Sequence, residues 1–225
     1  MGFKSGCRTG IRFHKEKYLM KNANWYFDFV SPFAYLHNFR LEEFSPHLNI
    51  ERKPLLFAGL LKHWNTKGPA ELNAKRIFTY RYVQWIAKRL DIPLRFPEHH
   101  PFNPIPLLRL CIAAGCTKKA VDSIFRCVWE DGLAGDDPDH WNTFCDAIEL
   151  NVSDANELIS SPEVKSELKT NGEMALEQGV FGVPTFVVDG HLFWGSDSTS
   201  LLHDYLADPG LFQSPAMKRL EILPG

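Results

Sequence analysis

The chain has 225 residues and a net charge of −2, with 44% hydrophobic and 23% charged residues. A chain of this length suits one or two domains and can bury a sizeable core without disulfide or metal support. The charge balance gives no reason to expect a nucleic-acid partner. No apolar run approaches the roughly 18 residues that a membrane-spanning helix needs, so we expect no membrane partner.

The five cysteines do not form a recognisable framework. They are Cys7, Cys111, Cys116, Cys127 and Cys145. Because the number is odd and no pair has Cys-x-x-Cys spacing, neither a disulfide framework nor a metal site is indicated. Free, mostly buried thiols are typical of a reducing compartment, and we predict a cytoplasmic protein. We expect Cys111 and Cys116, in a helical stretch, to be core residues rather than a redox pair.

Residues 1–22 form a basic segment in which Glu16 is the only acidic residue. The segment lacks the apolar stretch of a secretory signal, and its arginine and serine content is low for a mitochondrial transit peptide. Met20, just before the first predicted strand, is an alternative start. We predict a disordered extension over residues 1–22.

The first predicted unit is β-α-β. Residues 24–30 are rich in aromatic side chains and indicate a buried strand. Ser31 followed by Pro32 is a strong helix start, and the helix is expected to run to about Phe44. Residues 48–52 form a plausible second strand, which Pro54 ends.

A block of predicted helices follows, and then two strands and a last helix. Phe78, Tyr82 and Trp85 recur at helical spacing, with Lys and Arg at the polar positions. The further predicted helices cover about 107–114, 120–129, 141–149, 161–179 and 199–206. The strands cover 185–188 and 192–194, and Asp189-Gly190 between them is typical of a tight type I′ hairpin.

This order predicts an α/β protein with a thioredoxin-like fold, in which a large all-helical insertion separates a βαβ half from a ββα half. We expect the thioredoxin-like domain to comprise residues 23–65 and 180–209. The helical insertion would comprise residues 66–179, and residues 210–225 would form a C-terminal tail.

A thioredoxin-like fold places the start of the first helix opposite the Val183-Pro184 step. Redox members open that helix with Cys-x-x-Cys, but here the four positions are Ser31 to Ala34. A ligand must therefore bring any reactive sulfur. The helix N-terminus favours an anion, and the Ser31 hydroxyl can donate a hydrogen bond to a thiolate. The alternative is a serine that only caps its own helix.

Other candidate ligand contacts lie in three segments. We predict a cis Val183-Pro184 bond that turns the Val183 backbone toward an extended peptide such as glutathione; a trans proline at a strand edge is the alternative. Asp197 can cap the last helix or accept from a ligand ammonium group. Lys67 and Lys75 can pair with a ligand carboxylate or remain solvated.

The proline-rich loop holds His99, His100 and Asn103. No third ligand stands at metal-site spacing, so we predict no metal. A surface loop is favoured there, with a wall of the substrate pocket as the second interpretation.

Several motifs, in this order and spacing, resemble the 2-hydroxychromene-2-carboxylate isomerases, which are relatives of kappa-class glutathione transferases in the DsbA-like branch of the thioredoxin fold. The resemblance covers about residues 24–208. Its motifs are residues 26–36, Lys67-Gly68-Pro69, Ile92-Pro93 with Phe96-Pro97, residues 181–185 and residues 193–197.

The resemblance implies glutathione as cofactor, with Ser31 at its sulfur. It implies that the backbone at Val183 and Pro184 pairs with the cysteinyl part. Asp197 would meet the γ-glutamyl end, Ser196 is a further expected cofactor contact, and Lys75 matches a family lysine. A family asparagine near the entry to the helical block has no clear match, since Thr66 or Glu71 occupies the likely places.

The resulting hypothesis is an isomerase in which the glutathione thiolate adds reversibly to an aromatic pyruvate or chromene substrate, a bond rotates, and glutathione leaves. The expected aromatic lining is Phe33, Tyr35, Trp64 and Phe102, and the candidate substrate-pocket residues are Phe33, Trp64, Thr66, His99 and Asn103.

Two other functions remain open from the sequence. One is a kappa-type glutathione transferase or peroxidase, and the other is a glutathione-binding thioredoxin-like protein without chemistry. A homodimer is compatible with the resemblance. The absence of Cys-x-x-Cys argues against a disulfide oxidoreductase.

Overall fold

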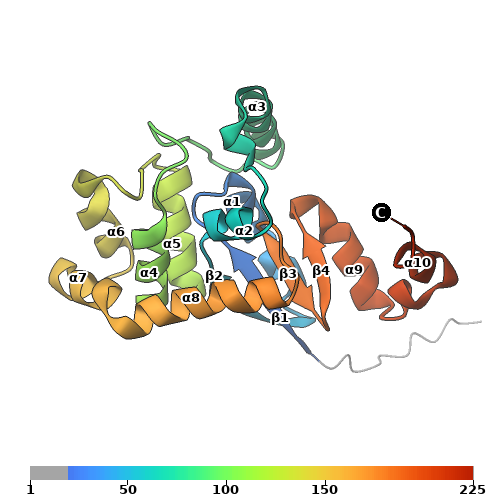
Figure 1. Cartoon of the computed structure of the whole chain (residues 1–225). Helices are drawn as coiled ribbons and strands as arrows, with labels where there is room; N and C mark the ends of the chain where they lie inside the picture. The colour runs from blue at the N-terminus through green and yellow to red at the C-terminus, as the bar shows by residue number, and fades with distance from the viewer. Residues whose placement is uncertain (1–19, 225) are drawn as a thin grey trace, which may run out of the picture.

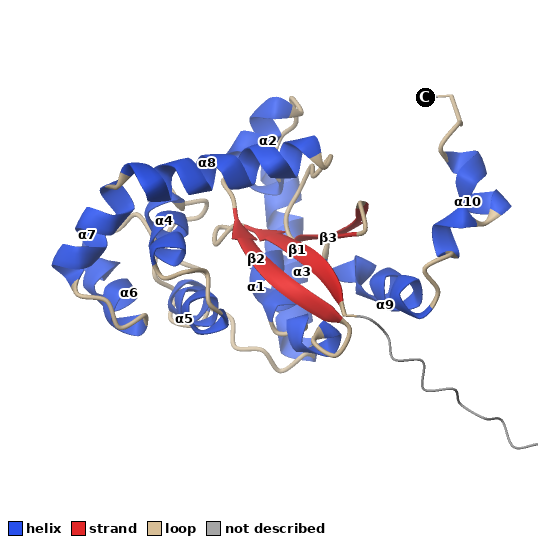
Figure 2. Ribbon diagram, turned by 90° about the horizontal axis from the view of Figure 1, so that it is seen from below, coloured by secondary structure: helices blue, strands red, loops and turns tan. Residues whose placement is uncertain are grey.

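A computed structural model describes residues 20–224, so most of the predicted N-terminal extension, with Cys7, lies outside the described residues. The described chain contains one four-stranded mixed sheet with the order β2-β1-β3-β4 (Figure 2). The strands are β1 (Lys21–Phe27), β2 (Leu48–Pro54), β3 (Thr185–Val188) and β4 (His191–Trp194). β1 pairs in parallel with β2 and antiparallel with β3, which forms a hairpin with β4.

The predicted thioredoxin-like fold with a helical insertion is confirmed (Figure 1). The helices are α1 (Pro32–Asn38), α2 (Phe57–His63), α3 (Asn73–Arg89), α4 (Ile105–Ala113), α5 (Lys118–Trp129), α6 (Trp141–Ala147), α7 (Val152–Ser160), α8 (Pro162–Glu177), α9 (Thr199–Ala207) and α10 (Pro215–Leu220). The predicted β-turn is present, since Asp189 and Gly190 both have positive φ (51° and 81°).

Several boundaries differ from the sequence-based expectation. β1 begins at Lys21, so the last two residues of the expected extension belong to a strand. β1 ends at Phe27 rather than at residue 30, and α1 ends at Asn38, after which residues 41–44 form a separate 3₁₀ turn. Neither α7 nor α10 was predicted. α7 is short and rich in polar residues, and α10 is a six-residue helix in the expected tail.

The alternating side chains of β1 divide the core between the two faces of the sheet. Trp25 and Phe27 are fully buried in the larger cluster, which α1 and α5 also enter. Tyr26 points to the opposite face, where a smaller cluster includes Leu60 of α2 and Ala175 of α8. Figure 2 shows the same division, with α2 and α8 on one side of the sheet and α1 and α5 on the other. The side chains of β1 are packed on both faces of the sheet, and this packing fixes the position from which the chain enters α1.

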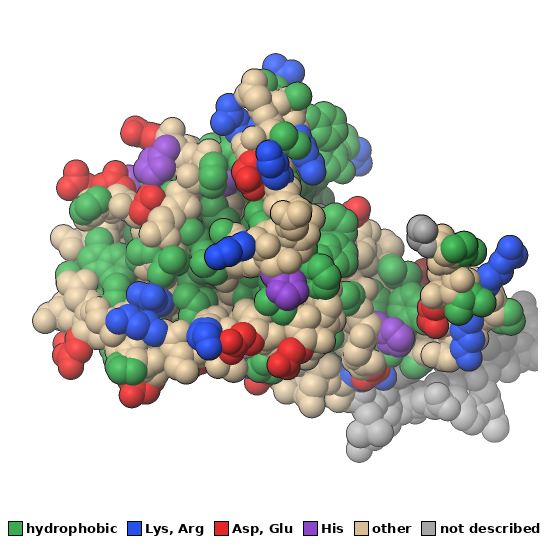
Figure 3. Space-filling view, in the orientation of Figure 1, with side chains coloured by type: hydrophobic (Ala, Val, Ile, Leu, Met, Phe, Trp, Pro, Cys, Tyr) green, Lys and Arg blue, Asp and Glu red, His purple; other side chains and the backbone are tan. Residues whose placement is uncertain are grey.

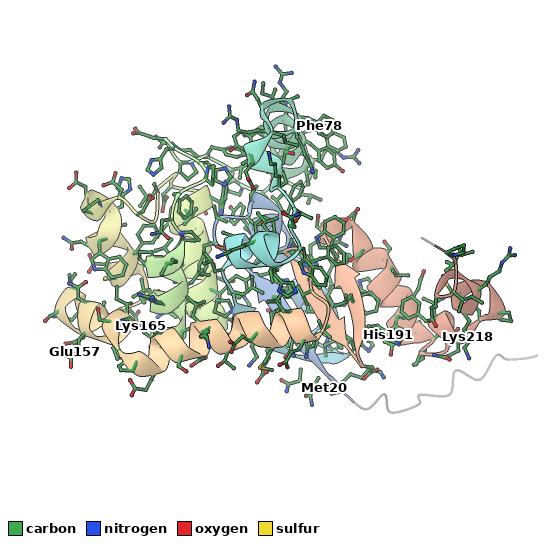
Figure 4. The ribbon with its side chains drawn as sticks, in the orientation of Figure 1. Met20, Phe78, Glu157, Lys165, His191 and Lys218 are labelled. Carbon is green, nitrogen blue, oxygen red and sulfur yellow. The ribbon has the colours of Figure 1, made fainter. Side chains whose placement is uncertain are left out.

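Helix α3 has the predicted helical spacing, but its aromatic stripe faces outward. Phe78 is 67% and Trp85 51% exposed, whereas Val83 and Ala87 are the buried positions of the helix. The rings of Phe78 and Tyr82 stack with centroids 5.9 Å apart, and those of Tyr82 and Trp85 with centroids 5.8 Å apart. Hydrophobic side chains are visible among Lys and Arg over this helix in Figure 3, and Figure 4 labels Phe78 there.

Among residues 20–224, no helix is both long and apolar enough to cross a membrane.

Candidate active site

Ser31 caps α1 at the point where the chain leaves the sheet. Its Oγ accepts the Ala34 N–H at 3.2 Å, and Pro32 occupies the first turn of the helix. A hydroxyl that accepts one hydrogen bond can still donate its own proton. Ser31 is 8% exposed, so its hydroxyl lies in a largely water-free environment. The hydroxyl and the positive end of α1 together favour an anion at this point.

The loop before Ser31 is held by three hydrogen bonds that Asp28 accepts, two from the loop itself and one from the start of α2. The fully buried Asp28 carboxylate accepts the Val30 N–H at 3.0 Å and the Phe57 N–H at 2.8 Å. The Asp28 carbonyl accepts the Ser31 N–H at 3.0 Å. Asp28 therefore ties the start of α1 to the start of α2.

His100 holds the same loop from the opposite side. Its Nε2 lies 2.7 Å from the Val30 carbonyl, which can only accept, so Nε2 donates. Its Nδ1 then accepts from the Tyr80 hydroxyl of α3 at 2.5 Å. Burial lowers the pKa of His100, so the ring is neutral at pH 7 and its tautomer is set by these two partners.

Asp28 is the acidic residue of the site whose pKa is strongly shifted. Burial raises its pKa to about 7, against the lowering effect of its two backbone hydrogen bonds. The carboxyl lies in the same wall as Ser31. Its ionisation near neutral pH therefore adds a negative charge close to the position that Ser31 and α1 make favourable for an anion.

A cavity of about 560 Å³ opens in front of Ser31. Its wall is mainly apolar, as small-molecule sites generally are. The lining includes Val30, Ser31, Phe33, Phe57, Leu61, Trp64, Thr66, Lys67, Glu71, Lys75, Thr79, Tyr80, His100, Phe102, Phe181, Val183 and Trp194. The exposed Lys67 and Lys75 are the cationic groups of this lining, and Asp28 and Glu71 are its acidic groups, so the cavity combines apolar walls with charged groups of both signs.

Most of the predicted site residues come together around this cavity. Ser31, Phe33, Trp64, Thr66, Lys75 and Val183 all line it, together with Phe102 and Lys67. The Val183–Pro184 bond is cis. Trp64 is fixed at the wall because its indole N–H donates to the Val180 carbonyl at 3.0 Å.

The remaining predicted residues lie outside the lining. Pro184 follows Val183 directly, and Ser196 and Asp197 lie on the 3₁₀ turn (Ser196–Ser198) that packs against α1. Tyr35 points into the core, where its hydroxyl donates to the Pro93 carbonyl at 2.6 Å.

His99 and Asn103, expected in the substrate pocket, do not line this cavity. Both are held by Asp136, which contacts the His99 ring at 2.8 Å and accepts the Asn103 N–H at 2.8 Å. Both residues are exposed. The neighbouring His100 points inward instead and lines the cavity.

Asp28, Tyr80 and Trp194 were missed as site residues from the sequence, whereas for His100 the second interpretation of the proline-rich loop, a wall of the pocket, agrees with the structure. Asp28 carried one available signal, because it is an acidic residue between two phenylalanines at the end of an aromatic-rich strand. Trp194 lies so close to Gly182 that a Cβ there would meet the indole nitrogen at 2.5 Å. This contact places Trp194 at the cavity, and no local pattern reveals it.

No group of three or more His, Cys, Asp or Glu side chains within residues 20–224 is placed to hold a metal ion. The site instead suits an anionic ligand with further carboxylate groups. Ser31 can donate to an anionic atom, and Lys67 and Lys75 can pair with carboxylates at the rim. A thiol-bearing peptide has this combination of groups.

Comparisons with known proteins identify the family. Residues 24–207 match the model of the DSBA-like thioredoxin domain, and the chain belongs to that family. It is 26% identical over 196 residues to a 2-hydroxychromene-2-carboxylate isomerase of Sphingobium xenophagum, covering 84% of this chain and all of the relative. It is 27% identical over 222 residues to glutathione S-transferase kappa 2 of Caenorhabditis elegans, covering 88% and 96%.

A solved structure of a 2-hydroxychromene-2-carboxylate isomerase superposes with a TM-score of 0.75 at 25% identity, covering 85% of this chain and 97% of that one. These comparisons confirm the resemblance to isomerases and kappa-class transferases that the sequence motifs indicated. The relatives are named as enzymes, as the sequence predicted.

Proposed function

We propose that this protein is a glutathione-dependent isomerase of the 2-hydroxychromene-2-carboxylate isomerase type. The observation that carries the proposal is the Ser31 hydroxyl, which caps α1 and faces a mainly apolar cavity with lysines at its rim. The relatives named above support the same assignment. Bound glutathione would supply a thiolate nucleophile that adds reversibly to an electron-poor carbon of a flat aromatic substrate.

The residues around Ser31 fit the binding of such a thiol. The Ser31 hydroxyl would donate a hydrogen bond to the sulfur, and the N-terminus of α1 favours the anionic form. The Val183 backbone lies where an extended peptide can pair with it, and Lys75 supplies a cation for a terminal carboxylate. Ser196 and Asp197 would receive the γ-glutamyl end from the turn beside α1.

The cavity wall would orient the substrate. Phe33, Trp64 and Phe102 offer flat apolar surfaces to an aromatic ring. His100 donates to the Val30 carbonyl and Tyr80 orients the His100 ring, and together they keep Ser31 in place. Exclusion of water from this wall strengthens the hydrogen bond from Ser31 to the anion.

The test compares Ser31→Ala with Ser161→Ala. Ser161 is a matched control because it also precedes a proline and caps a helix, accepting the Val164 N–H at 3.3 Å, but it does not line the cavity. Glutathione binding is measured by calorimetry, the thiol pKa by thiolate absorbance against pH, and turnover with 2-hydroxychromene-2-carboxylate. Removal of one donor to an anionic reacting group typically lowers kcat by about 10²–10³-fold.

We expect wild type and Ser161→Ala to bind glutathione, lower its thiol pKa and turn over substrate. Ser31→Ala should keep most of the binding affinity but lose the lowered thiol pKa and the turnover. Equal turnover by Ser31→Ala would refute its role. No saturable binding by the wild type would refute glutathione as the cofactor.

A kappa-type transferase or peroxidase activity is the second candidate. The half-exposed Phe181 and Trp194 form a T-shaped pair, with centroids 4.9 Å apart, in the cavity lining, and an open aromatic mouth can admit varied electrophiles. Conjugation of glutathione to an aryl halide, without isomerisation of a chromene, would favour this activity. Tight glutathione binding without turnover of either substrate would instead favour a non-catalytic binding protein.

We also propose that a second copy of the chain covers the aromatic stripe of α3, giving a homodimer. Tyr82 links this stripe to Phe33 in the cavity lining, with ring centroids 6.3 Å apart, so a partner on α3 would border the cavity. Exposed apolar patches of this kind are typical of protein interfaces. Sedimentation should show a dimer in the wild type and a monomer for a Phe78→Ser, Trp85→Ser variant; a monomeric wild type would refute the proposal.

A cytoplasmic location is proposed on the state of the thiols. Cys111, Cys116, Cys127 and Cys145 are all free. A reducing compartment keeps such thiols in this state. Fractionation of expressing cells would test the assignment, and recovery in an oxidising compartment would refute it.

A further inference from the structure

Two cysteines meet where α4 ends. Cys111 is fully buried in the last turns of the helix, and the chain then reverses through Gly115 (φ +72°) and Cys116 (φ +50°). The Cys116 N–H donates to the Cys111 carbonyl at 2.9 Å. The two side chains are also close enough that Cys116 contributes to the raised pKa of Cys111. The reversed turn therefore brings one sulfur onto the other, although the sequence spacing suggested two independent core residues.

This arrangement meets the geometric demands of a disulfide. A disulfide joins Cα atoms roughly 4.4–6.8 Å apart with the Cβ atoms facing each other. Two residues that share a main-chain hydrogen bond fall within that range, and contact between the thiols shows that their side chains converge. Bond formation requires the two sulfur atoms to approach to bonding distance with a suitable Cβ–S–S–Cβ dihedral.

The surroundings make the two thiols unequal. Cys116 is half-buried and is the thiol that solvent can reach. Burial raises the pKa of Cys111, and the neighbouring Glu167 of α8 acts in the same direction, whereas Arg52 of β2 acts against it. The Arg52 Nε is buried and has no hydrogen-bond partner within the described part of the chain. An unpartnered guanidinium nitrogen near Cys111 favours a transient thiolate there.

We propose that Cys111 and Cys116 form a reversible intramolecular disulfide, with glutathione disulfide as the oxidant. The Cys116 thiolate attacks one sulfur of glutathione disulfide, which forms a mixed disulfide and releases one glutathione thiolate. Cys111 then gives its proton to water, and its sulfur attacks Cys116 Sγ and releases the second glutathione thiolate. The protein loses two electrons and two protons, and one glutathione disulfide becomes two thiols.

The proposal is independent of the function proposed for the cavity, because the exchange needs only solvent access to Cys116. Trypsin makes it directly measurable, since cleavage after Arg109 and Lys118 releases residues 110–118 with both cysteines in one peptide. The full-length protein is incubated in glutathione buffers of increasing disulfide content, acid-quenched, alkylated, digested and analysed by mass spectrometry.

In the wild type, the 110–118 peptide should escape alkylation and lose the mass of two hydrogen atoms, and excess reduced glutathione should reverse this change. Cys111→Ser should stop at the mixed disulfide on Cys116. Cys127→Ser is the matched control, because it removes a buried thiol elsewhere and should leave the oxidation unchanged. A wild-type peptide that keeps two alkylated thiols, or that stops at the mixed disulfide as the Cys111→Ser variant does, would overturn the proposal.

Discussion

Asp28→Asn tests the buried carboxyl that ties α1 to α2. The substitution keeps the size of the side chain and removes its ability to ionise. Both Asp28 oxygens accept backbone N–H groups, from Val30 and Phe57. An asparagine has one acceptor oxygen, so its NH₂ group must face one of the two donors. We expect the variant to lose about 1–3 kcal/mol of stability at pH 4, where the wild-type carboxyl is protonated.

The stability difference between Asp28→Asn and wild type changes sign as the pH rises. Burial raises the pKa of Asp28 to about 7 in the folded protein, from 3.8 in an exposed carboxyl. Between these values the unfolded chain releases a proton that the folded chain keeps, so the free energy of unfolding of the wild type falls as the pH rises. One pH unit corresponds to about 1.4 kcal/mol, so the total fall is on the order of 4 kcal/mol between pH 4 and pH 7. Asparagine does not titrate, and the variant lacks this fall.

The assay is urea unfolding of both proteins at pH values from 4 to 8. The difference in unfolding free energy between variant and wild type should rise by several kcal/mol in favour of the variant and level off above pH 7. Asp136→Asn is a control whose pH dependence has the opposite sign. Hydrogen bonds from the Asn103 backbone and from His99 lower the pKa of Asp136, so this carboxylate stabilises the folded protein at neutral pH and loses that effect only as the pH falls. A constant difference between Asp28→Asn and wild type from pH 4.5 to pH 8 would refute the ionisation of Asp28 near neutral pH.

Three further predictions concern a lysine of the cavity lining, a tyrosine of its wall and a phenylalanine of the core. Lys75→Ala should weaken glutathione binding about tenfold and reduce the salt dependence of that binding. Lys88→Ala, on the same helix but outside the cavity lining, should do neither, and equal affinities of Lys75→Ala and wild type by calorimetry would contradict the role of Lys75. Tyr80→Phe removes the hydroxyl that bonds His100 and should lower kcat three- to tenfold without changing glutathione affinity by more than about twofold; an unchanged kcat would count against positioning through His100. Phe29→Ala empties a fully buried core site and should lower the unfolding free energy by about 3–5 kcal/mol, measured with denaturant; a loss below about 1 kcal/mol would contradict its place in the core.

The sequence by itself determined the features that depend on neighbouring residues. Ser31-Pro32 and Ser161-Pro162 mark helix starts, because a serine side chain satisfies a free N–H and proline already has helical φ. Asp189-Gly190 marks the hairpin, because both residues tolerate positive φ. The absence of Cys-x-x-Cys at the start of α1 also follows from the sequence alone. These local rules were sufficient for the four strands, for most of the helices and hence for the fold class, although α7 and α10 were missed.

The direction in which a side chain faces was decided by the tertiary structure. His99 and His100 are adjacent, yet Asp136 holds the first outside the cavity while Val30 and Tyr80 hold the second within its wall. The helical spacing on α3 is the same whether the aromatic face meets the core or solvent, and the structure places it outward. The contact between Cys111 and Cys116 depends on a reversed turn, and the pKa of Asp28 depends on burial by elements far along the chain. The cysteine contact arises from the backbone angles of a short turn, and the other properties arise from partners distant in the sequence, which local patterns do not encode.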